Sequence, residues 1–278
     1  MTNNELVAPF VKWVGGKRQL LKEITPLIPK DANLYCEPFL GGGAVLFSTQ
    51  PQNAVINDLN RELMLVYRIV RDNVEALISV LETYQNTKEC FYKIRALDRD
   101  KSAYQLIPDI EKAARTLYLN KTCFNGLFRV NAKGEFNTAF GRYKNPSIVN
   151  APTLRAVSVY LNENNIQILN EDFSDVLQRV PENSFVYLDP PYDPASNTAN
   201  FTKYNSCGFS RDDQIRLKTQ CDELTRRGVK FLLSNSATAF IKDLYHDYAV
   251  TSVYSKRSVN SDANKRGAVE EVLVRNYD

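Results

Sequence analysis

The tetrapeptide Asp189-Pro190-Pro191-Tyr192 carries the clearest chemical pattern in the sequence. Two consecutive prolines restrict the backbone where the strand leaves the sheet. Their carbonyl groups are therefore not hydrogen-bonded within a tight turn and can face a ligand. The segment offers a carboxylate acceptor at Asp189, a main-chain acceptor at Pro190 and an aromatic face at Tyr192. This set suits an exocyclic amine on a planar ring, because two acceptors hold its N–H bonds while the aromatic ring stacks on the base. The simpler alternative is a turn with a capping aspartate, which the position after the apolar run Phe185–Leu188 disfavours.

A glycine-rich stretch, EPFLGGG from Glu37 to Gly43, follows the first predicted strand. Glycines there let a ligand approach the backbone at the carboxyl edge of a sheet. The stretch departs from G-x-G-x-x-G, because Leu46 takes the last glycine position when counting starts at Gly41, and this disfavours a nicotinamide cofactor. Asp58 ends the next strand, where an acid can accept both hydroxyls of a ribose. A glycine loop and a ribose acid without a phosphate motif predict a nucleoside ligand without phosphates, and S-adenosylmethionine fits.

The stretch FVKWVGGK, from Phe10 to Lys17, precedes the first predicted strand. We expect Lys17 at the start of a helix, where an ammonium and free amide hydrogens bind a carboxylate, such as the one on the methionine arm of S-adenosylmethionine. A phosphate loop is the alternative. It is disfavoured because Arg18 replaces the serine or threonine that G-x-x-x-x-G-K-[ST] requires and because no strand precedes the stretch.

Basic residues are concentrated in one segment, although the formal net charge of the chain is only +3. Between Lys112 and Lys144 the one acid is Glu135, against seven basic residues: Lys112, Arg115, Lys121, Arg129, Lys133, Arg142 and Lys144. Asparagines and aromatic residues are interleaved with them. A solvated helix face explains basic residues but not the aromatics and amides, so the mixture favours phosphate neutralisation combined with base contacts.

The order of predicted elements indicates one α/β sheet interrupted by an insertion. Strands are predicted at 34–36, 54–56, 166–169, 185–188 and 229–233, with helices at 152–163, 174–179 and 210–227. Two further segments, 249–254 and 269–275, predict a closing hairpin around a polar loop. Residues 61–150 are predicted to be helical as far as Asn120 and loop-like afterwards. We therefore expect a catalytic domain of residues 1–60 and 151–278 and an inserted domain of residues 61–150.

Composition excludes several classes of protein and site. Hydrophobic residues make up 44% of the 278 residues, which suits an ordinary buried core. The N-terminus shows neither a basic leader nor an apolar signal core, and no apolar run is long enough to span a membrane, so a cytoplasmic protein is expected. The five cysteines have no close pair, which favours reduced thiols. His246 is the single histidine, and we expect it to be a surface or partly buried residue rather than a catalytic one. This disfavours histidine-based catalysis and multi-histidine metal sites, so no metal is expected.

Taken in this order, and with Asn-Gly-Leu-Phe-Arg and Gly-Glu-Phe-Asn between them, these patterns resemble the Dam-type, α-group DNA adenine-N6 methyltransferases. The resemblance covers about residues 9–277 and includes the stretches Asn200–Thr202 and Leu233–Asn235. It implies a Rossmann-like methyltransferase sheet with S-adenosylmethionine as cofactor and an inserted target-recognition domain. It also implies that the cofactor site is lined by Trp13, Lys17, Phe39, Gly41, Asp58 and Asp189, with Asp172 and Phe173 holding the cofactor's adenine.

The same resemblance implies how duplex DNA is read. The stretch FNGLFR, from Phe124 to Arg129, matches the family's base-reading hairpin and includes Asn125. Arg129 would contact a guanine, Leu127 a thymine methyl group, and Phe124 would wedge into the space that the extracted adenine leaves. Lys12 would reach the outer guanine and Tyr143 the flanking backbone. The implied site is GATC, with one departure: Ala139 stands where family members often have proline.

Other functions share parts of this pattern. An RNA adenine or protein glutamine N-methyltransferase is one alternative, and a catalytically silent DNA-binding regulator is another. The leading aspartate of the tetrapeptide and the basic insertion favour duplex DNA over the first, and the complete cofactor set disfavours the second. The chain either has a cognate restriction endonuclease as a partner or methylates DNA alone, and the loop Lys256–Gly267 either grips phosphates or is solvated.

Overall fold

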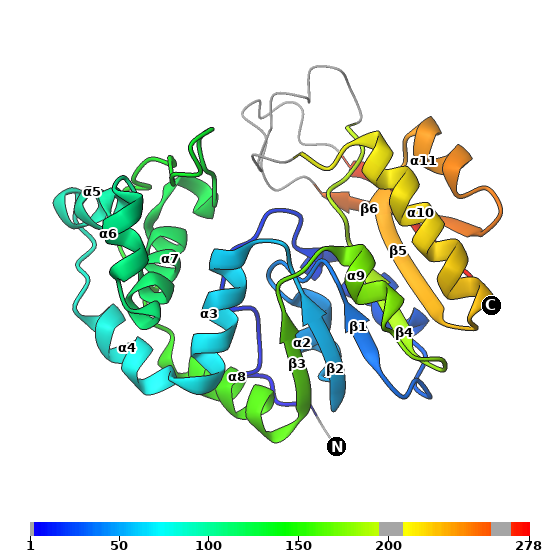
Figure 1. The fold of residues 1–278 in the computed structure, drawn as a ribbon, viewed down its shortest axis with the longest axis horizontal. Helices are drawn as coiled ribbons and strands as arrows, with labels where there is room; N and C mark the ends of the chain where they lie inside the picture. Colours follow the sequence, from blue (N-terminus) through cyan, green and yellow to red (C-terminus); the bar gives the residue numbers. More distant parts are fainter. Residues whose placement is uncertain (1–2, 195–207, 257–267) are drawn as a thin grey trace.

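The computed structural model describes residues 3–194, 208–256 and 268–278. The stretch Asn200–Thr202, Cys207 and residues 257–267 of the polar loop lie outside the described residues. The chain forms a seven-stranded sheet with the order β3-β2-β1-β4-β5-β7-β6 (Figure 1). The strands are β1 (Tyr35–Glu37), β2 (Asn53–Asn57), β3 (Asn165–Leu169), β4 (Phe185–Leu188), β5 (Lys230–Ser236), β6 (Ala249–Lys256) and β7 (Ala268–Arg275).

Strands β1 to β5 are parallel, and β7 pairs antiparallel with both β5 and β6. The prediction of a mostly parallel α/β sheet closed by an antiparallel hairpin is therefore confirmed. The chain winds outward from β1 through β2 to β3 and then returns to β4 and β5 on the other side of β1. The strand order thus reverses between β1 and β4, which is where open α/β sheets bind ligands, beyond the carboxyl ends of the strands.

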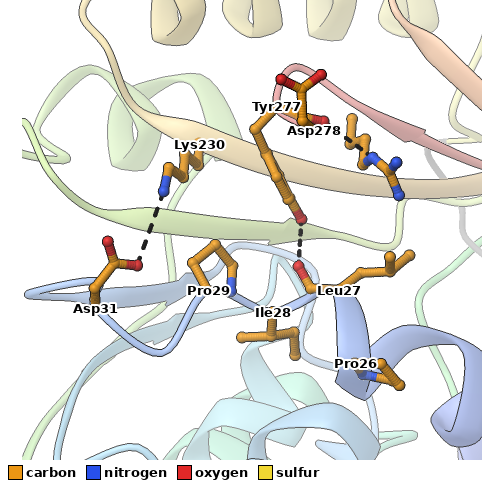
Figure 2. Close-up of a pocket in the computed structure, with 9 residues that line it drawn as sticks. Pro26, Leu27, Ile28, Pro29, Asp31, Lys230, Tyr277 and Asp278 are labelled. Atoms are coloured by element: carbon orange, nitrogen blue, oxygen red, sulfur yellow. Dashed lines mark hydrogen bonds and ion pairs between the residues drawn. The ribbon is translucent and has the colours of Figure 1, made fainter.

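The opposite edge of the sheet, at the amino end of β5, carries an open cavity of about 380 Å³ (Figure 2). Lys230, Arg275, Tyr277 and the segment around Pro26–Pro29 line it. The Tyr277 hydroxyl donates to the Leu27 carbonyl at 2.7 Å, which ties the end of the chain to this segment. None of the predicted site residues lines this cavity, so it is separate from the candidate site.

Helices follow the strands as the sequence predicts. They are α1 (Leu21–Ile24), α2 (Ala44–Thr49), α3 (Arg61–Asp72), α4 (Val74–Glu82), α5 (Lys88–Ala96), α6 (Lys101–Leu106), α7 (Asp109–Thr122), α8 (Ala151–Glu163), α9 (Phe173–Gln178), α10 (Arg211–Arg226) and α11 (Ala239–Leu244), with 3₁₀ turns η1 (Lys17–Leu20), η2 (Thr25–Leu27) and η3 (Phe124–Gly126). Asn60, Asp172 and Ser210 cap the amino ends of α3, α9 and α10. Among the helices of the described part of the chain, none has the length and hydropathy of a membrane-spanning segment.

Side chains on the two faces of the sheet form two separate hydrophobic clusters. In β4, Phe185 and Tyr187 belong to one cluster, and Val186 and Leu188 belong to the other. This alternation explains why β4 is apolar throughout: helices cover both of its faces. Helices α9, α10 and α11 cover one face, whereas α2, α3 and α8 cover the other (Figure 1).

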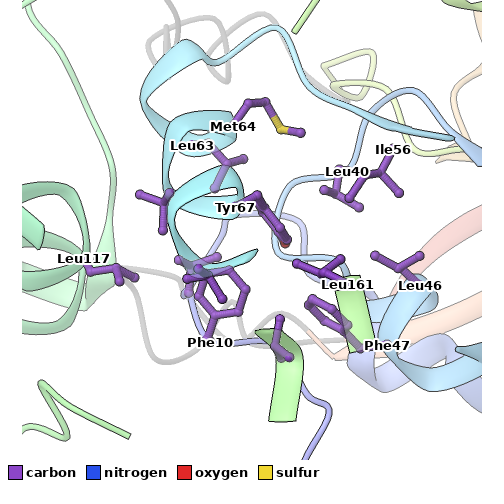
Figure 3. Packing of buried hydrophobic residues seen from close by; sticks show 14 of the residues in the cluster. Phe10, Leu40, Leu46, Phe47, Ile56, Leu63, Met64, Tyr67, Leu117 and Leu161 are labelled. Atoms are coloured by element: carbon purple, nitrogen blue, oxygen red, sulfur yellow. The ribbon is translucent and has the colours of Figure 1, made fainter. Parts of the chain in front are cut away.

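The second of these faces includes Tyr67 of α3, which lies among Phe10, Phe47, Leu63 and other buried residues (Figure 3). Its hydroxyl donates to the Gly41 carbonyl at 3.1 Å, so the core itself holds the glycine loop. Helices α4 to α7 lie beyond α3, on the side of the molecule away from β6 (Figure 1). Helix α3 contacts α7 as well as α8 and β3, and the same hydrophobic cluster reaches Leu117 of α7.

Candidate active site

Asp189 follows β4 at the carboxyl edge of the sheet, next to the point where the strand order reverses. Its carboxylate lies 2.7 Å from the Lys17 ammonium and accepts a hydrogen bond from the Ser234 hydroxyl at 3.0 Å. Ser234 belongs to β5, the parallel neighbour of β4. Two segments far apart in the sequence therefore fix this carboxylate.

The Lys17 ammonium occupies the space between a carboxylate and an aromatic ring. It lies 4.6 Å from the centre of the Tyr192 ring and donates to the Gly15 carbonyl at 2.8 Å. The Lys17 side chain is only 6% exposed. Asp189 and Tyr192 thus bind the Lys17 ammonium through an ion pair and a cation–π contact.

The two proline carbonyls differ in their surroundings. The Gln214 side chain of α10 donates to the Pro191 carbonyl at 2.8 Å, and Asn235 of β5 donates in turn to Gln214 at 3.0 Å. Among the described residues no donor reaches the Pro190 carbonyl. A buried amide therefore already engages the Pro191 carbonyl, whereas within the described residues the Pro190 carbonyl stays available as an acceptor.

Burial raises the pKa of the Asp189 carboxyl above its usual range, while the Lys17 ammonium and the hydrogen bonds from Lys17 and Ser234 oppose this rise. Burial and the nearby Asp189 and Glu271 carboxylates raise the pKa of Tyr192, so its hydroxyl stays protonated and donates. It donates to Glu271 of β7 at 2.6 Å. The ring of Tyr192 is thus held at its far end.

Glu37, at the end of β1, adds a buried carboxyl group beneath the glycine loop. Burial raises its pKa to about 8, against the hydrogen bond that Tyr35 donates to it at 2.6 Å, and the Asp189 and Asp58 carboxylates contribute to the rise. Since the ordinary pKa is 4.5, the folded chain binds this proton more tightly than the unfolded chain between pH 4.5 and about 8. The contribution of Glu37 to stability is therefore largest below pH 4.5 and falls as the pH rises towards 8.

This pH dependence can be tested with Glu37→Gln, which keeps an acceptor for Tyr35 but cannot ionise. We expect the variant to lose less stability than the original chain between about pH 5 and about pH 9, by on the order of a few kcal/mol. Urea unfolding at both pH values measures this, and Glu23→Gln is the matched control because Glu23 is exposed. An unchanged pH dependence in Glu37→Gln would contradict the assignment.

The glycine loop and Asp58 form the next part of the site. Gly41 has a φ of +51°, and a Cβ there would lie 2.9 Å from the Trp13 ring, so only glycine lets the Trp13 ring lie against the loop. The Asp58 carboxylate accepts hydrogen bonds from the backbone N–H groups of Gly41 and Asn60, each at 2.9 Å. A carboxylate has about four acceptor positions, so Asp58 keeps about two for a ligand such as a ribose diol.

Aromatic rings continue the site on the other side of the loop. Phe39 and Phe173 lie with ring centres 5.3 Å apart, and Phe209 lies 5.8 Å from each. Asp172 caps α9 and pairs with Arg216, whose guanidinium also lies 4.3 Å from the Phe173 ring. Burial raises the pKa of Asp172, but the hydrogen bonds from Arg216 and Ser174 outweigh it and the pKa is lowered. The acidic, hydroxyl-accepting and aromatic groups along this edge fit a nucleoside with a cationic side arm.

The predicted DNA-reading residues lie together on a second part of the structure. Residues 123–140 form an antiparallel loop, with bridges between Cys123 and Phe140 and between Val130 and Phe136. Asn120 accepts from the Lys12 backbone N–H at 2.8 Å and donates to the Lys12 carbonyl at 2.7 Å, which brings Lys12 beside this loop. The Lys12 ammonium lies 5.0 Å from the Tyr143 ring.

Side chains at the start of this loop face outward. Phe124 is 56% exposed, and Asn125 is exposed with a left-handed φ of 56°. Arg129 is exposed, and its Nε donates to Asn137 at 2.8 Å, which orients the guanidinium. Leu127 is half-buried. The Trp13 ring stacks on Phe128 at 5.3 Å, so this loop contacts the segment that carries Lys17.

Two expectations about polar residues have different outcomes. Arg115 is only 2% exposed and pairs with Asp98 at 2.6 Å, so the interpretation of Arg115 as a phosphate contact is wrong. Asp98 also accepts from the Phe136 backbone N–H at 2.7 Å, and the buried pair therefore supports the antiparallel loop from beneath. His246 lies exposed on the surface, as expected.

Sequence reasoning missed three residues that shape the tetrapeptide, namely Gln214, Glu271 and, as a direct partner of Asp189, Ser234. For Ser234 a signal existed, because it directly follows the strand predicted at 229–233, and that strand lies parallel to the one that precedes Asp189. For Gln214 and Glu271 the sequence holds no such signal, since each is a polar residue in an amphipathic segment.

Comparisons with known proteins show the family to which the chain belongs. Residues 13–259 match the family model described as D12 class N6 adenine-specific DNA methyltransferase. The type II methyltransferase M1.LlaDCHI of Lactococcus lactis subsp. cremoris is 44% identical over 271 residues, which cover 97% of this chain and 95% of that protein. The type II methyltransferase M.MjaIII of Methanocaldococcus jannaschii is 41% identical over 291 residues, covering 98% and 99%. The DNA adenine methylase of Escherichia coli is 34% identical, covering 95% and 93%. The chain therefore belongs to the D12 class of N6 adenine-specific DNA methyltransferases.

Proposed function

We propose that this enzyme transfers a methyl group from S-adenosylmethionine to N6 of an adenine within GATC, after the adenine has left the DNA helix. The observation that carries the proposal is the amino group of Lys17 held between the Asp189 carboxylate and the Tyr192 ring. An exocyclic adenine amine is neutral, but it too donates to an acceptor such as the Asp189 carboxylate, and the base that carries it can stack on the Tyr192 ring. A base inside a duplex cannot reach them, and extruding it costs a few kcal/mol.

Each residue of the tetrapeptide then has its own role in methyl transfer. Asp189 and the Pro190 carbonyl accept hydrogen bonds from the two N–H groups of N6. These bonds draw the nitrogen towards tetrahedral geometry and free its lone pair from conjugation with the adenine ring. Tyr192 stacks on the base and fixes its plane. When bound, S-adenosylmethionine supplies the methyl group on a sulfonium. Positive charge develops on N6 during transfer, and Asp189 stabilises it before the proton leaves.

Lys17 has to release Asp189 before N6 can take its place. A ligand carboxylate near η1 gives the Lys17 ammonium another partner, which is the role proposed for the methionine arm. Asp58 then accepts the ribose hydroxyls beside Gly41, and Trp13 covers the loop. Phe39, Phe173 and Asp172 hold the adenine of the cofactor. Asp172 does so through an acceptor position of its carboxylate that Arg216 does not occupy.

Recognition of GATC is assigned to the exposed loop. Arg129 contacts a guanine through its free N–H groups, and Leu127 contacts a thymine methyl group. Phe124 fills the space of the extracted adenine, and Asn125 belongs to the same turn. Lys12 reaches the outer guanine while Tyr143 presses against the flanking backbone. Two observations support this assignment. Phe124, Asn125 and Arg129 are exposed in the loop, and Asn120 ties Lys12, which lies against the Tyr143 ring, to the same loop.

A digestion experiment tests the product and the site together. Plasmid DNA is incubated with the enzyme and S-adenosylmethionine, and then digested with nucleases that cut GATC only when adenine is unmethylated or only when it is methylated. We expect protection from the first and cleavage by the second. Cutting by the first nuclease despite methyl incorporation into the DNA would contradict GATC. Incorporation into RNA or protein in place of DNA would contradict the substrate.

A further inference from the structure

Glu271 lies on β7, the strand of the closing hairpin that runs between β5 and β6. It pairs with Ser236 of β5 on one side and with Val253 of β6 on the other. Glu271 is only 8% exposed. One carboxylate oxygen accepts from the Tyr192 hydroxyl at 2.6 Å, and the other accepts from the Ser255 hydroxyl.

The neighbouring acid shows that this placement is specific. Glu270 points to the opposite face of β7, as strand geometry requires, and bonds Lys242 at 3.0 Å and Ser252 at 2.6 Å. The Glu270 side chain is 38% exposed, whereas Glu271 is buried. A buried carboxylate is costly unless donors satisfy it, and among the described residues the Tyr192 and Ser255 hydroxyls donate to Glu271.

The hydrogen bond acts on the ring that faces the reacting amine. Anchoring the tyrosine hydroxyl fixes where the far end of the ring lies. Because a phenol O–H prefers to lie in the plane of its ring, the direction of the acceptor also favours one orientation of the ring face. The face so presented lies 4.6 Å from the Lys17 ammonium, which itself lies 2.7 Å from the Asp189 carboxylate. A carboxylate on β7 therefore helps to set the orientation of Tyr192 relative to Asp189.

We propose that Glu271 is a positioning residue for methyl transfer, which acts through the Tyr192 hydroxyl by holding the ring where the target amine binds. Ser255 supports it by orienting the second carboxylate oxygen. The inference rests on the proposed function of Tyr192. It assigns to the β6–β7 hairpin a part in the reaction that neither the tetrapeptide nor the cofactor-site residues supply.

The test is a double-mutant cycle on the whole enzyme, measured as kcat and KM for methylation of a GATC duplex. The single variants Glu271→Ala and Tyr192→Phe each remove the same hydrogen bond, and we expect each to lower kcat about tenfold, the size expected for a hydrogen bond to a charged group. The double variant will be about as active as the weaker single variant, because the two changes remove one interaction. Glu271→Gln keeps an acceptor and will stay within about threefold of the original kcat. Glu270→Ala is the matched control and will leave kcat unchanged.

Several outcomes would overturn the inference. Independent, multiplying losses in the double variant would show that Glu271 does not act through Tyr192. An equal loss of kcat in Glu271→Ala and Glu271→Gln would show that the hydrogen bond is not the cause of the loss. A normal kcat in folded Glu271→Ala would exclude any role of Glu271 in methyl transfer. Thermal unfolding checks that each variant is folded, and Tyr192→Phe with Glu271→Gln keeps the test valid if Glu271→Ala does not fold. The proposed function fails separately, when the unsubstituted enzyme itself does not methylate adenine in the duplex.

Discussion

Replacing Asp189 with alanine will lower kcat by about 10³-fold or more, while much of the affinity for DNA remains. The Asp189 carboxylate accepts a hydrogen bond from the target amine and stabilises the positive charge that develops on the amine nitrogen. DNA affinity depends mainly on phosphate contacts made elsewhere. Methyl incorporation under single-turnover conditions gives the first quantity, and a fluorescence anisotropy titration with a GATC duplex gives the second.

Two further variants make this result interpretable. Asp189→Ala leaves the buried Lys17 ammonium without its carboxylate partner, so a loss of folding has to be separated from a loss of chemistry. Asp189→Asn keeps the shape and should also be nearly inactive. Asp175→Ala removes an exposed acid in the first turn of α9 and should keep full activity. Near-normal turnover in Asp189→Ala would refute the assigned chemistry.

Replacing Arg129 with alanine will reduce discrimination at one base pair by about 10- to 100-fold, because a bidentate arginine–guanine contact contributes about 1–3 kcal/mol. Arg129 is exposed, and its Nε is already held by Asn137, which leaves the outer N–H groups to face the duplex. The measurement is kcat/KM on GATC and on duplexes with single base-pair changes at each position.

Lys133→Ala is the control for this experiment, because Lys133 lies exposed in the same loop. A lysine that contacts only phosphates should affect all duplexes alike and should reduce the salt dependence of binding. Full discrimination by Arg129→Ala at every position would contradict the recognition proposal. A uniform loss on all duplexes would instead assign Arg129 to the phosphate backbone.

Much of the sheet was predictable because its strands are buried on both faces. The run Phe185–Leu188 is apolar at every position, since alternate side chains enter two different clusters, and such a run between polar segments indicates a parallel strand. The hairpin of β6 and β7 was predictable for a related reason, namely two segments of strand-forming residues around a polar loop. Helix α11 was not predicted, because its six residues are too few to show a helical period.

The candidate site was predictable only where function requires a local pattern. Asp189 to Tyr192 and the loop from Glu37 to Gly43 are contiguous, so their chemistry is visible in the sequence. Partners that come from distant segments are not. Arg115 belongs to a basic stretch, yet its partner Asp98 is brought to it by the packing of α5 against α7, which converts a surface cation into a buried support.

Lys17 is a second residue whose partner could not be predicted from the sequence. Its segment predicts a group that binds a carboxylate, and the structure contains such a contact, but with the Asp189 side chain. Only the fold reveals that η1 lies across the carboxyl end of β4. The exchange of Lys17 between Asp189 and a cofactor carboxylate follows from this contact and not from the spacing of residues.

The central claim is that Asp189, Pro190 and Tyr192 enclose the amino group of an extruded adenine. A crystal structure of the enzyme with a GATC duplex and a non-reactive analogue of S-adenosylmethionine tests it most directly. The account predicts the adenine outside the helix, with N6 within about 3 Å of both the Asp189 carboxylate and the Pro190 carbonyl, the Tyr192 ring stacked on the base and the Lys17 ammonium withdrawn from Asp189. A ternary complex in which the adenine binds elsewhere while Lys17 still pairs with Asp189 would contradict it.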